Sequence, residues 1–141
     1  MAVQINREEL FQIIDFYKSF KEYSKFSRME LFSHILPAFN FNQYKIYYDN
    51  DKIIGYCSWC FLDDLTQKAF KKTGELNSKK WKSGDNFWVY DFLCKGDVKS
   101  MANDVKKICK ECSGVGVRMK WLRIKNNELV MSKSFLTQSR W

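Results

Sequence analysis

The sequence predicts one α+β domain, in which helices pack on the faces of a mostly antiparallel sheet. Three observations lead to this prediction: two amphipathic helical stripes at the start of the chain, hairpin-like pairs of strand-forming stretches, and one central strand that is apolar on both faces. The chain has 141 residues and is 45% apolar, which is enough for one packed core. No repeat or linker interrupts it, so we expect a single domain over residues 1–141.

Two helices are expected at the start of the chain. Asn6 is followed by a glutamate three positions later, which is the spacing of a helix start, and apolar residues recur at helical spacing from Leu10 to Phe20. Ser27 repeats the capping spacing and opens a second helix. Because proline has no backbone N–H to donate, we expect Pro37 to stop that helix.

A β-hairpin is expected next, with strands over residues 43–48 and 52–62 and a polar turn at 49–51. Gly55 within it marks a bulge or the close approach of a neighbouring element. A helix over 63–72, a polar loop over 73–80 and a turn over 81–85 are expected to follow, and they lead to the strand that contains Asp91. After that strand we expect a basic helix over 101–112, which Gly114 and Gly116 end. Strands over 117–124 and 128–136, joined by a turn at 126–127, complete the chain's predicted elements.

One acid lies inside the most apolar strand. Simple alternation gives one face to Phe87, Val89, Asp91 and Leu93 and the other to Trp88, Tyr90 and Phe92. Both faces are apolar, which is typical of an interior strand. A buried carboxylate is costly unless it is paired or hydrogen-bonded. Asp91 is therefore either functional, with a pKa raised by burial, or structural, bonded to backbone amides or to a lysine.

The net charge of +8 and the pI near 9.2 imply an acidic partner, which is nucleic acid, an anionic membrane or an acidic protein. Basic and aromatic residues alternate over 79–82 and 118–123, which would suit single-stranded nucleic acid, but a solvated basic face explains them better. No stretch is apolar enough to span a membrane and no secretion signal is visible, so we expect a soluble, cytoplasmic protein whose five cysteines are reduced.

Metal and phosphate motifs receive little support. The pairs Cys57/Cys60 and Cys109/Cys112 have the spacing of zinc ligands, but the first pair lies in a strand, where this spacing puts the two thiols on opposite faces. We expect no metal site. Residues 111–116 distantly resemble the glycine-rich pyrophosphate loop of GNAT acetyltransferases, and a helix C-cap explains them as well. With His34 as the only histidine, a hydrolase triad is not supported.

Five short blocks resemble, in order and spacing, the RTX-toxin-activating lysine acyltransferases: Leu36-Pro37-Ala38, Asn42-Gln43-Tyr44, residues 56–59, residues 81–85 and residues 88–91. The resemblance implies a GNAT-like fold and the transfer of a fatty acyl chain from acyl carrier protein to internal lysines of a protoxin in the cytoplasm. It also implies that Asp91 is the catalytic aspartate. Tyr23 holds the place of the family's catalytic histidine, and His34 stands where members usually carry asparagine.

These observations lead us to expect a protein-lysine acyltransferase. Asp91 would act as general base or orient the base, and Tyr23 or His34 would give or relay a proton. We assign Ser58, Trp59 and Gly84 to the acyl donor, with backbone amides near Ser58 and Trp59 holding the oxyanion.

We expect no bound cofactor, with acyl carrier protein, or coenzyme A in its place, delivering the acyl group as co-substrate. The acidic carrier would account for the basic charge, and the second partner would be a toxin-like protein with a target lysine. The oligomeric state is left open, a homodimer included. The alternative is a binding module of the same fold that has lost its chemistry and recognises a protein or nucleic acid through its basic surface.

Overall fold

The computed structural model describes residues 5–125 and 128–138, with side chains described outside 123–133. The turn predicted at 126–127 lies outside the described residues. The order of elements agrees with the prediction. Their bounds are α1 (Arg7–Lys18), α2 (Arg28–Asn40), β1 (Tyr44–Asp49), β2 (Lys52–Leu62), α3 (Asp64–Thr73), β3 (Asn86–Cys94), α4 (Val98–Ser113), β4 (Arg118–Lys125) and β5 (Glu128–Leu136).

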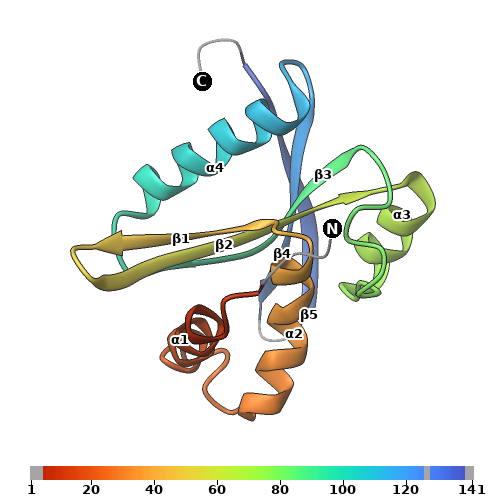
Figure 1. Cartoon of the computed structure of the whole chain (residues 1–141). Helices are drawn as coiled ribbons and strands as arrows, with labels where there is room; N and C mark the ends of the chain where they lie inside the picture. Colours follow the sequence, from red (N-terminus) through yellow and green to blue (C-terminus); the bar gives the residue numbers. More distant parts are fainter. Residues whose placement is uncertain (1–4, 126–127, 139–141) are drawn as a thin grey trace.

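The described strands form one sheet in the order β1-β2-β3-β4-β5, in which every neighbouring pair is antiparallel except β3 and β4. This confirms the predicted α+β class with a mostly antiparallel sheet. Helix α4 makes the crossover that the parallel pair needs. Figure 1 shows α1 and α2 on one side of the sheet and α4 on the other. Strands β3 and β4 are in register at Trp88 with Lys120 and at Val89 with Trp121.

Both N-terminal helices begin where the sequence predicts. The side chain of Asn6 accepts the N–H of Glu9, and Ser27 forms a complete capping box. The prediction that Pro37 stops α2 is wrong, because the helix continues to Asn40 with the proline inside it. A proline inside a helix costs about 3 kcal/mol. The turn beyond Pro37 carries apolar side chains that are 1% exposed, and burying each large one stabilises by about 1.5–3 kcal/mol, which offsets the cost.

Gly55 fulfils both expectations placed on it. The pairing of β1 with β2 shifts by one residue beside it, between Tyr47 and Tyr48. A Cβ atom at Gly55 would also lie 2.7 Å from Sδ of Met101 on α4. This glycine therefore lets α4 pack closely against the hairpin.

A second bulge lies next to Asp91. Strands β2 and β3 pair at Ser58 with Asp91, and the next pair along β2 joins Trp59 to Val89. Tyr90 is thereby left as the extra residue of β3, which shifts the alternation of side chains by one position.

The packing of β3 shows this shift directly. Residues before and after the bulge contact the same cluster under α4, namely Phe87, Val89, Phe92 and Cys94. The opposite face, toward α1, α2 and α3, receives Trp88, Tyr90 and Leu93. The prediction that simple alternation holds through this strand is therefore wrong, and the reason is the extra residue, which changes the face of every side chain that follows it.

Candidate active site

The carboxylate of Asp91 is the meeting point of three side chains from the N-terminal part of the chain. The Tyr17 hydroxyl donates to Oδ2 over 2.5 Å, and Nε2 of His34 lies 2.6 Å from the same oxygen. The Tyr23 hydroxyl donates to Oδ1 over 3.4 Å. Tyr23 and His34, which the sequence offered as alternatives, thus both reach the aspartate that it singled out.

The bulge positions this group. Because Tyr90 is extra, Asp91 projects toward α1 and α2 rather than into the cluster under α4. Its backbone N–H donates to Oγ of the buried Ser58 over 3.2 Å, which ties the residue to β2. Helix α1 then supplies Tyr17 and α2 supplies His34, whose rings meet edge to face with centroids 5.8 Å apart.

Charge and burial act against each other at the Asp91–His34 pair. Burial raises the pKa of Asp91, but the charge of His34 and the hydrogen bonds from His34, Tyr17 and Tyr23 outweigh it, so this pKa is lowered from its usual value. Burial lowers the pKa of His34, yet the charge of Asp91 and its hydrogen bond raise it overall. The expectation of a raised aspartate pKa is therefore wrong, because burial alone neglects the imidazole.

The two tyrosines remain donors. Burial, then the charge of Asp91, raise the pKa of Tyr17, while for Tyr23 the charge of Asp91 is the larger cause and burial the smaller. Both hydroxyls therefore keep their protons at neutral pH and bond the carboxylate in its ionised form.

Exposure separates the roles of the two charged groups. The side chain of His34 is 30% exposed and that of Asp91 is 9% exposed, so a substrate can reach the imidazole but not the carboxylate. Since Nε2 bonds Asp91, Nδ1 is the ring nitrogen left to exchange a proton with a substrate. The geometry therefore favours the second role considered for Asp91, that of orienting the base, over that of general base itself.

The residues assigned to the acyl donor are placed differently from one another. Ser58 contacts the backbone of Asp91, as described above. The N–H of Trp59 donates to the carbonyl of Gln43 over 3.0 Å and is thus engaged within the fold. Gly84 lies where a Cβ atom would come within 2.5 Å of the Asp63 backbone, so close packing explains this glycine. A role for Ser58, Trp59 and Gly84 in donor binding stays a prediction.

Other sequence motifs have structural explanations. Cys57 packs under α4 and Cys60 packs on the opposite face of the sheet, as their spacing predicts. Gly114 caps α4, and the N–H of Gly116 donates to the carbonyl of Thr137 over 3.0 Å, so this amide is already engaged. Trp81 is 1% exposed and cannot act as a stacking platform for a base.

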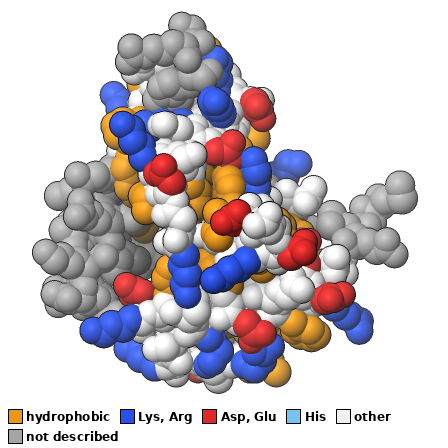
Figure 2. Space-filling model, turned by 90° about the vertical axis from the view of Figure 1, so that its left-hand side faces the viewer, with side chains coloured by type: hydrophobic (Ala, Val, Ile, Leu, Met, Phe, Trp, Pro, Cys, Tyr) orange, Lys and Arg blue, Asp and Glu red, His pale blue; other side chains and the backbone are white. Residues whose placement is uncertain are grey.

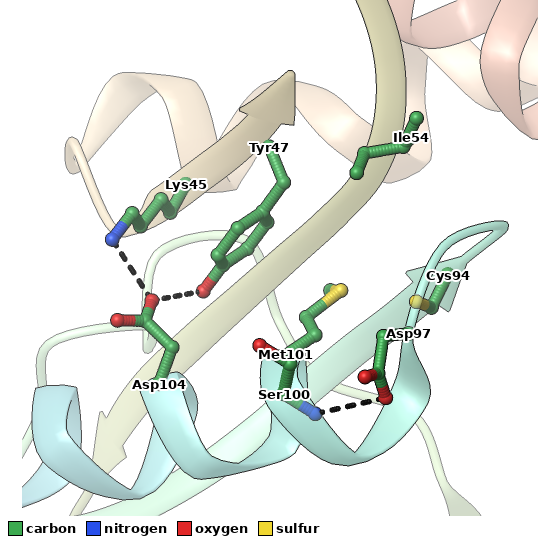
Figure 3. Close-up of a pocket in the computed structure, with 8 residues that line it drawn as sticks. All are labelled: Lys45, Tyr47, Ile54, Cys94, Asp97, Ser100, Met101 and Asp104. Atoms are coloured by element: carbon green, nitrogen blue, oxygen red, sulfur yellow. Dashed lines mark hydrogen bonds and ion pairs between the residues drawn. The ribbon is translucent and has the colours of Figure 1, made fainter. Parts of the chain in front are cut away.

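A second polar cluster lies on the α4 side of the sheet. It borders a hollow of about 350 Å³ between the hairpin and the start of α4 (Figure 3). Asp104 of α4 accepts the Tyr47 hydroxyl over 2.5 Å and the Lys45 ammonium over 2.8 Å. Neither Asp91 nor His34 lines this hollow.

Tyr17 is the residue that the sequence interpretation missed. Its position in the apolar stripe of α1 predicts burial, which is correct, but gives no sign of the acceptor it meets. The one available signal is a hydroxyl in a stripe of aliphatic residues, since a buried tyrosine hydroxyl needs a partner.

The fold is thus a mostly antiparallel sheet covered by helices, consistent with a GNAT-like arrangement, and it carries a part-exposed imidazole held by a buried carboxylate. The chain belongs to the RTX toxin acyltransferase family, whose family model matches residues 4–133. In the part of the chain that the structure describes, no helix has the length and apolar character needed to span a membrane.

Curated relatives agree with this family. The leukotoxin-activating lysine-acyltransferase LktC of Pasteurella haemolytica-like sp. strain 5943B is 38% identical over 43% of this chain and 37% of its own length. LktC serotype T3 of Mannheimia haemolytica is 33% identical over 60% of this chain and 50% of its own length. The protein-lysine myristoyltransferase RtxC of Kingella kingae is 30% identical over 57% of this chain and 50% of its own length. The chain thus spans half or less of the length of these relatives.

Proposed function

We propose that this chain transfers an acyl group from a thioester donor to the ε-amine of a lysine in a protein substrate. The observation that carries the proposal is the pair formed by His34 and Asp91, with Nε2 and Oδ2 2.6 Å apart and the imidazole half-exposed. A lysine amine must lose a proton in order to attack a carbonyl, and an imidazole oriented by a carboxylate is suited to accept it.

In the proposed step, the lysine nitrogen attacks the thioester carbonyl carbon, and Nδ1 of His34 accepts the proton that the nitrogen loses. The tetrahedral intermediate collapses with cleavage of the carbon–sulfur bond, and the imidazolium returns the proton to the departing thiolate. Asp91 stabilises the imidazolium through Nε2 and does not itself change its protonation state. Tyr17 and Tyr23 hold the carboxylate in place by donating to it.

The names of the relatives support the choice of a toxin-like substrate. Two of them are named for activating leukotoxin and one for myristoylating protein lysines. We extend this to a toxin-like substrate protein here, with acyl carrier protein as the donor and the cytoplasm as the site of reaction. The charge of +8 supports an acidic carrier as partner.

The alternative is a binding module of the same fold that has no catalytic activity. It was considered because a tyrosine, Tyr23, stands at the place of the family's catalytic histidine. The contact of His34 with Asp91 weakens that argument, because an imidazole is present at the carboxylate after all. It is supplied by α2, whereas Tyr23 lies between the two N-terminal helices.

The test is intact-mass spectrometry of candidate lysine-bearing proteins after incubation with this protein and a series of acyl carrier protein thioesters. We expect an acyl mass increment on a substrate that is lost with Asp91→Asn. The matched control is Asp104→Asn, which changes a carboxylate with a similar tyrosine partner on the other side of the sheet and should retain the increment. No increment with any donor, from protein shown to be folded, would support the binding module instead.

A further inference from the structure

Two lysines lie near the ring of Trp88, on the same face of the sheet as Asp91, and an arginine lies near one of them. The ammonium groups of Lys71 and Lys120 lie 5.8 and 5.9 Å from the centroid of the Trp88 ring. Lys120 is the register partner of Trp88 in the parallel pair, and Arg118 projects from the same face of β4 two residues earlier. We call Lys71, Arg118 and Lys120 the basic patch.

Neutral groups hold the central lysine of the patch. The Lys120 ammonium donates to Oε1 of Gln67 over 3.2 Å and to Oδ1 of Asn86 over 3.3 Å. Both amides are fixed in turn, since Gln67 accepts the Trp88 indole N–H over 3.0 Å and Asn86 donates to Asp64 over 3.0 Å. This framework positions the ammonium group without neutralising it.

The charges of the patch are close enough to repel one another. The pKa of Lys120 is lowered, first by burial and then by the charges of Lys71 and Arg118, while Asp64 opposes this shift. Arg118 donates to the neutral hydroxyl of Ser134 over 3.0 Å. Among the side chains that the structure describes, no carboxylate forms an ion pair with any of these three cations. Such a cluster is stabilised by an anionic partner.

The opposite end of the molecule is different. Figure 1 shows α3, which carries Lys71, on the side away from the tip of the β1–β2 hairpin. On the face that Figure 2 shows, which includes the hairpin side, acidic and basic side chains are interspersed. The basic patch is therefore better suited to an acidic surface than the face shown in Figure 2 is.

Aromatic rings connect the basic patch to the active site. Phe70 contacts both Trp88 and Tyr90, with centroids 5.3 and 6.0 Å apart, and Tyr90 lies 5.3 Å from the His34 ring. Along β3, Trp88 precedes Asp91 by three residues, a span of about 10 Å. A partner seated on the patch can therefore present a flexible reactive arm to His34.

We propose that Lys71, Arg118 and Lys120 are the docking surface for an acidic face of the protein that carries the acyl thioester. This inference rests on the proposed function in naming the carrier as the partner. The ligand groups are carboxylates of the carrier's folded surface, which would lie among the three cations, while its thioester arm reaches toward His34 past the part-exposed Tyr90.

The test measures binding without turnover. A fluorescently labelled holo-acyl carrier protein is titrated with this protein, and anisotropy gives the dissociation constant at two salt concentrations. The double variant Lys71→Glu/Arg118→Glu changes two exposed residues and leaves the part-buried Lys120 framework in place. We expect its dissociation constant to rise about tenfold or more at low salt, with a weaker salt dependence than the wild type.

The matched control is Lys52→Glu/Lys99→Glu, which changes the net charge equally at exposed positions on β2 and α4. It should bind the carrier within about twofold of the wild type. An equal loss of affinity for the carrier in both double variants, in proteins shown by circular dichroism to be folded, would overturn the proposed docking surface. Absence of binding by the wild type would overturn it as well. Apo-carrier, which lacks the arm, should bind nearly as well as holo-carrier. A requirement for the arm would instead assign the cations to its phosphate and overturn the acidic-surface proposal.

Failure of the proposed function has a separate signature. If the carrier binds through the basic patch but no acyl transfer is seen with any substrate, docking stands and catalysis fails. If transfer occurs and its KM for acyl carrier is unchanged by Lys71→Glu/Arg118→Glu, catalysis stands and the docking surface is wrong.

Discussion

Two carboxylates on opposite faces of the sheet have similar partners and different surroundings. Asp91 accepts a tyrosine hydroxyl over 2.5 Å and has a histidine nitrogen 2.6 Å away, and Asp104 accepts a tyrosine hydroxyl over 2.5 Å and a lysine over 2.8 Å. The side chain of Asp91 is 9% exposed and that of Asp104 is 34% exposed. The basic partner and the access of water therefore distinguish them.

This difference decides which pair can do chemistry. An ammonium stays charged at neutral pH, so the Lys45–Asp104 pair is a fixed ion pair that joins the hairpin to α4. An imidazole can both accept and release a proton, so the His34–Asp91 pair is suited to proton transfer. Of the two pairs, only the His34–Asp91 pair is therefore expected to take part in proton transfer, through the imidazole.

Removing each charge in turn tests this difference most directly. We expect Asp91→Asn to lower the rate of acyl transfer about 1,000-fold, because the imidazolium formed in the reaction loses its counter-charge. Asp104→Asn should lower it by less than about twofold. Single-turnover kinetics with an acyl carrier thioester measure both rates. Equal effects in the two variants would show that Asp91 has no special role.

Replacing the imidazole should have an effect at least as large, because Asp91 acts only through it. His34→Gln keeps a polar side chain but cannot accept a proton, and we expect the rate to fall about 1,000-fold or more. In the wild type the rate should rise with pH through the His34 pKa, which lies above 6.5, because only the neutral ring is a base. The variant should lose this rise. A pH profile that keeps the same midpoint in His34→Gln would contradict the assignment.

The two tyrosine hydroxyls that bond these carboxylates give a comparison of stability. Tyr17→Phe removes a donor from a carboxylate that water hardly reaches, and should lower the free energy of unfolding by about 2 kcal/mol. Tyr47→Phe removes an equally short bond, but water can replace it at the more exposed Asp104, so about 1 kcal/mol or less is expected. Urea denaturation measures both values, and a larger loss for Tyr47→Phe would reverse our ranking of the two sites.

The pH dependence of stability should also differ between the pairs. The folded pKa of His34 is raised, so its contribution is present below the unfolded value of about 6.5 and is lost as pH rises through the folded value. The folded pKa of Asp91 is lowered, so its contribution is present above about 3.9 and is lost as pH falls through the folded value.

The stability advantage of the wild type over His34→Gln should therefore be largest between these limits, at about 1 kcal/mol. Urea midpoints at pH 5.5 and pH 8.5 measure it. An advantage that does not shrink between these two pH values would exclude the ion pair as its source.

Tyr23→Phe should have the smallest effect. Its bond to Asp91 is 3.4 Å long, and Tyr17 and His34 still bond the carboxylate, so we expect the transfer rate to fall only about threefold. The same kinetic assay measures it. A loss comparable with that of His34→Gln would instead make Tyr23 a proton donor in the reaction.

Local signals made most of the fold and part of the site predictable. The helix starts at Asn6 and Ser27 depend on side chains within one turn, and the unusual position of Asp91 is visible because its neighbours in the strand are apolar. The course of α2 through Pro37 was not predictable, because the packing that offsets the proline comes from elements distant in sequence.

The contacts that three side chains make with Asp91 could not be predicted from the sequence, for a different reason. Tyr17, Tyr23 and His34 come from two helices and the segment between them, and their contact with β3 depends on how those helices pack on the sheet. No spacing rule relates them. The lowered pKa of Asp91 could likewise not be derived from the sequence, because it depends on the neighbour that the tertiary fold supplies.

The extra residue in β3 affects how relatives should be aligned. The side chains of β3 alternate between the two faces of the sheet, and this alternation shifts by one position at Tyr90. Asp91 lies in the part of the strand that follows the shift. An insertion or deletion of one residue between Trp88 and Asp91 would change no chemical group of the site, yet it would turn the carboxylate away from His34. For homologues of this chain, the number of residues between these two positions therefore matters as much as their identity.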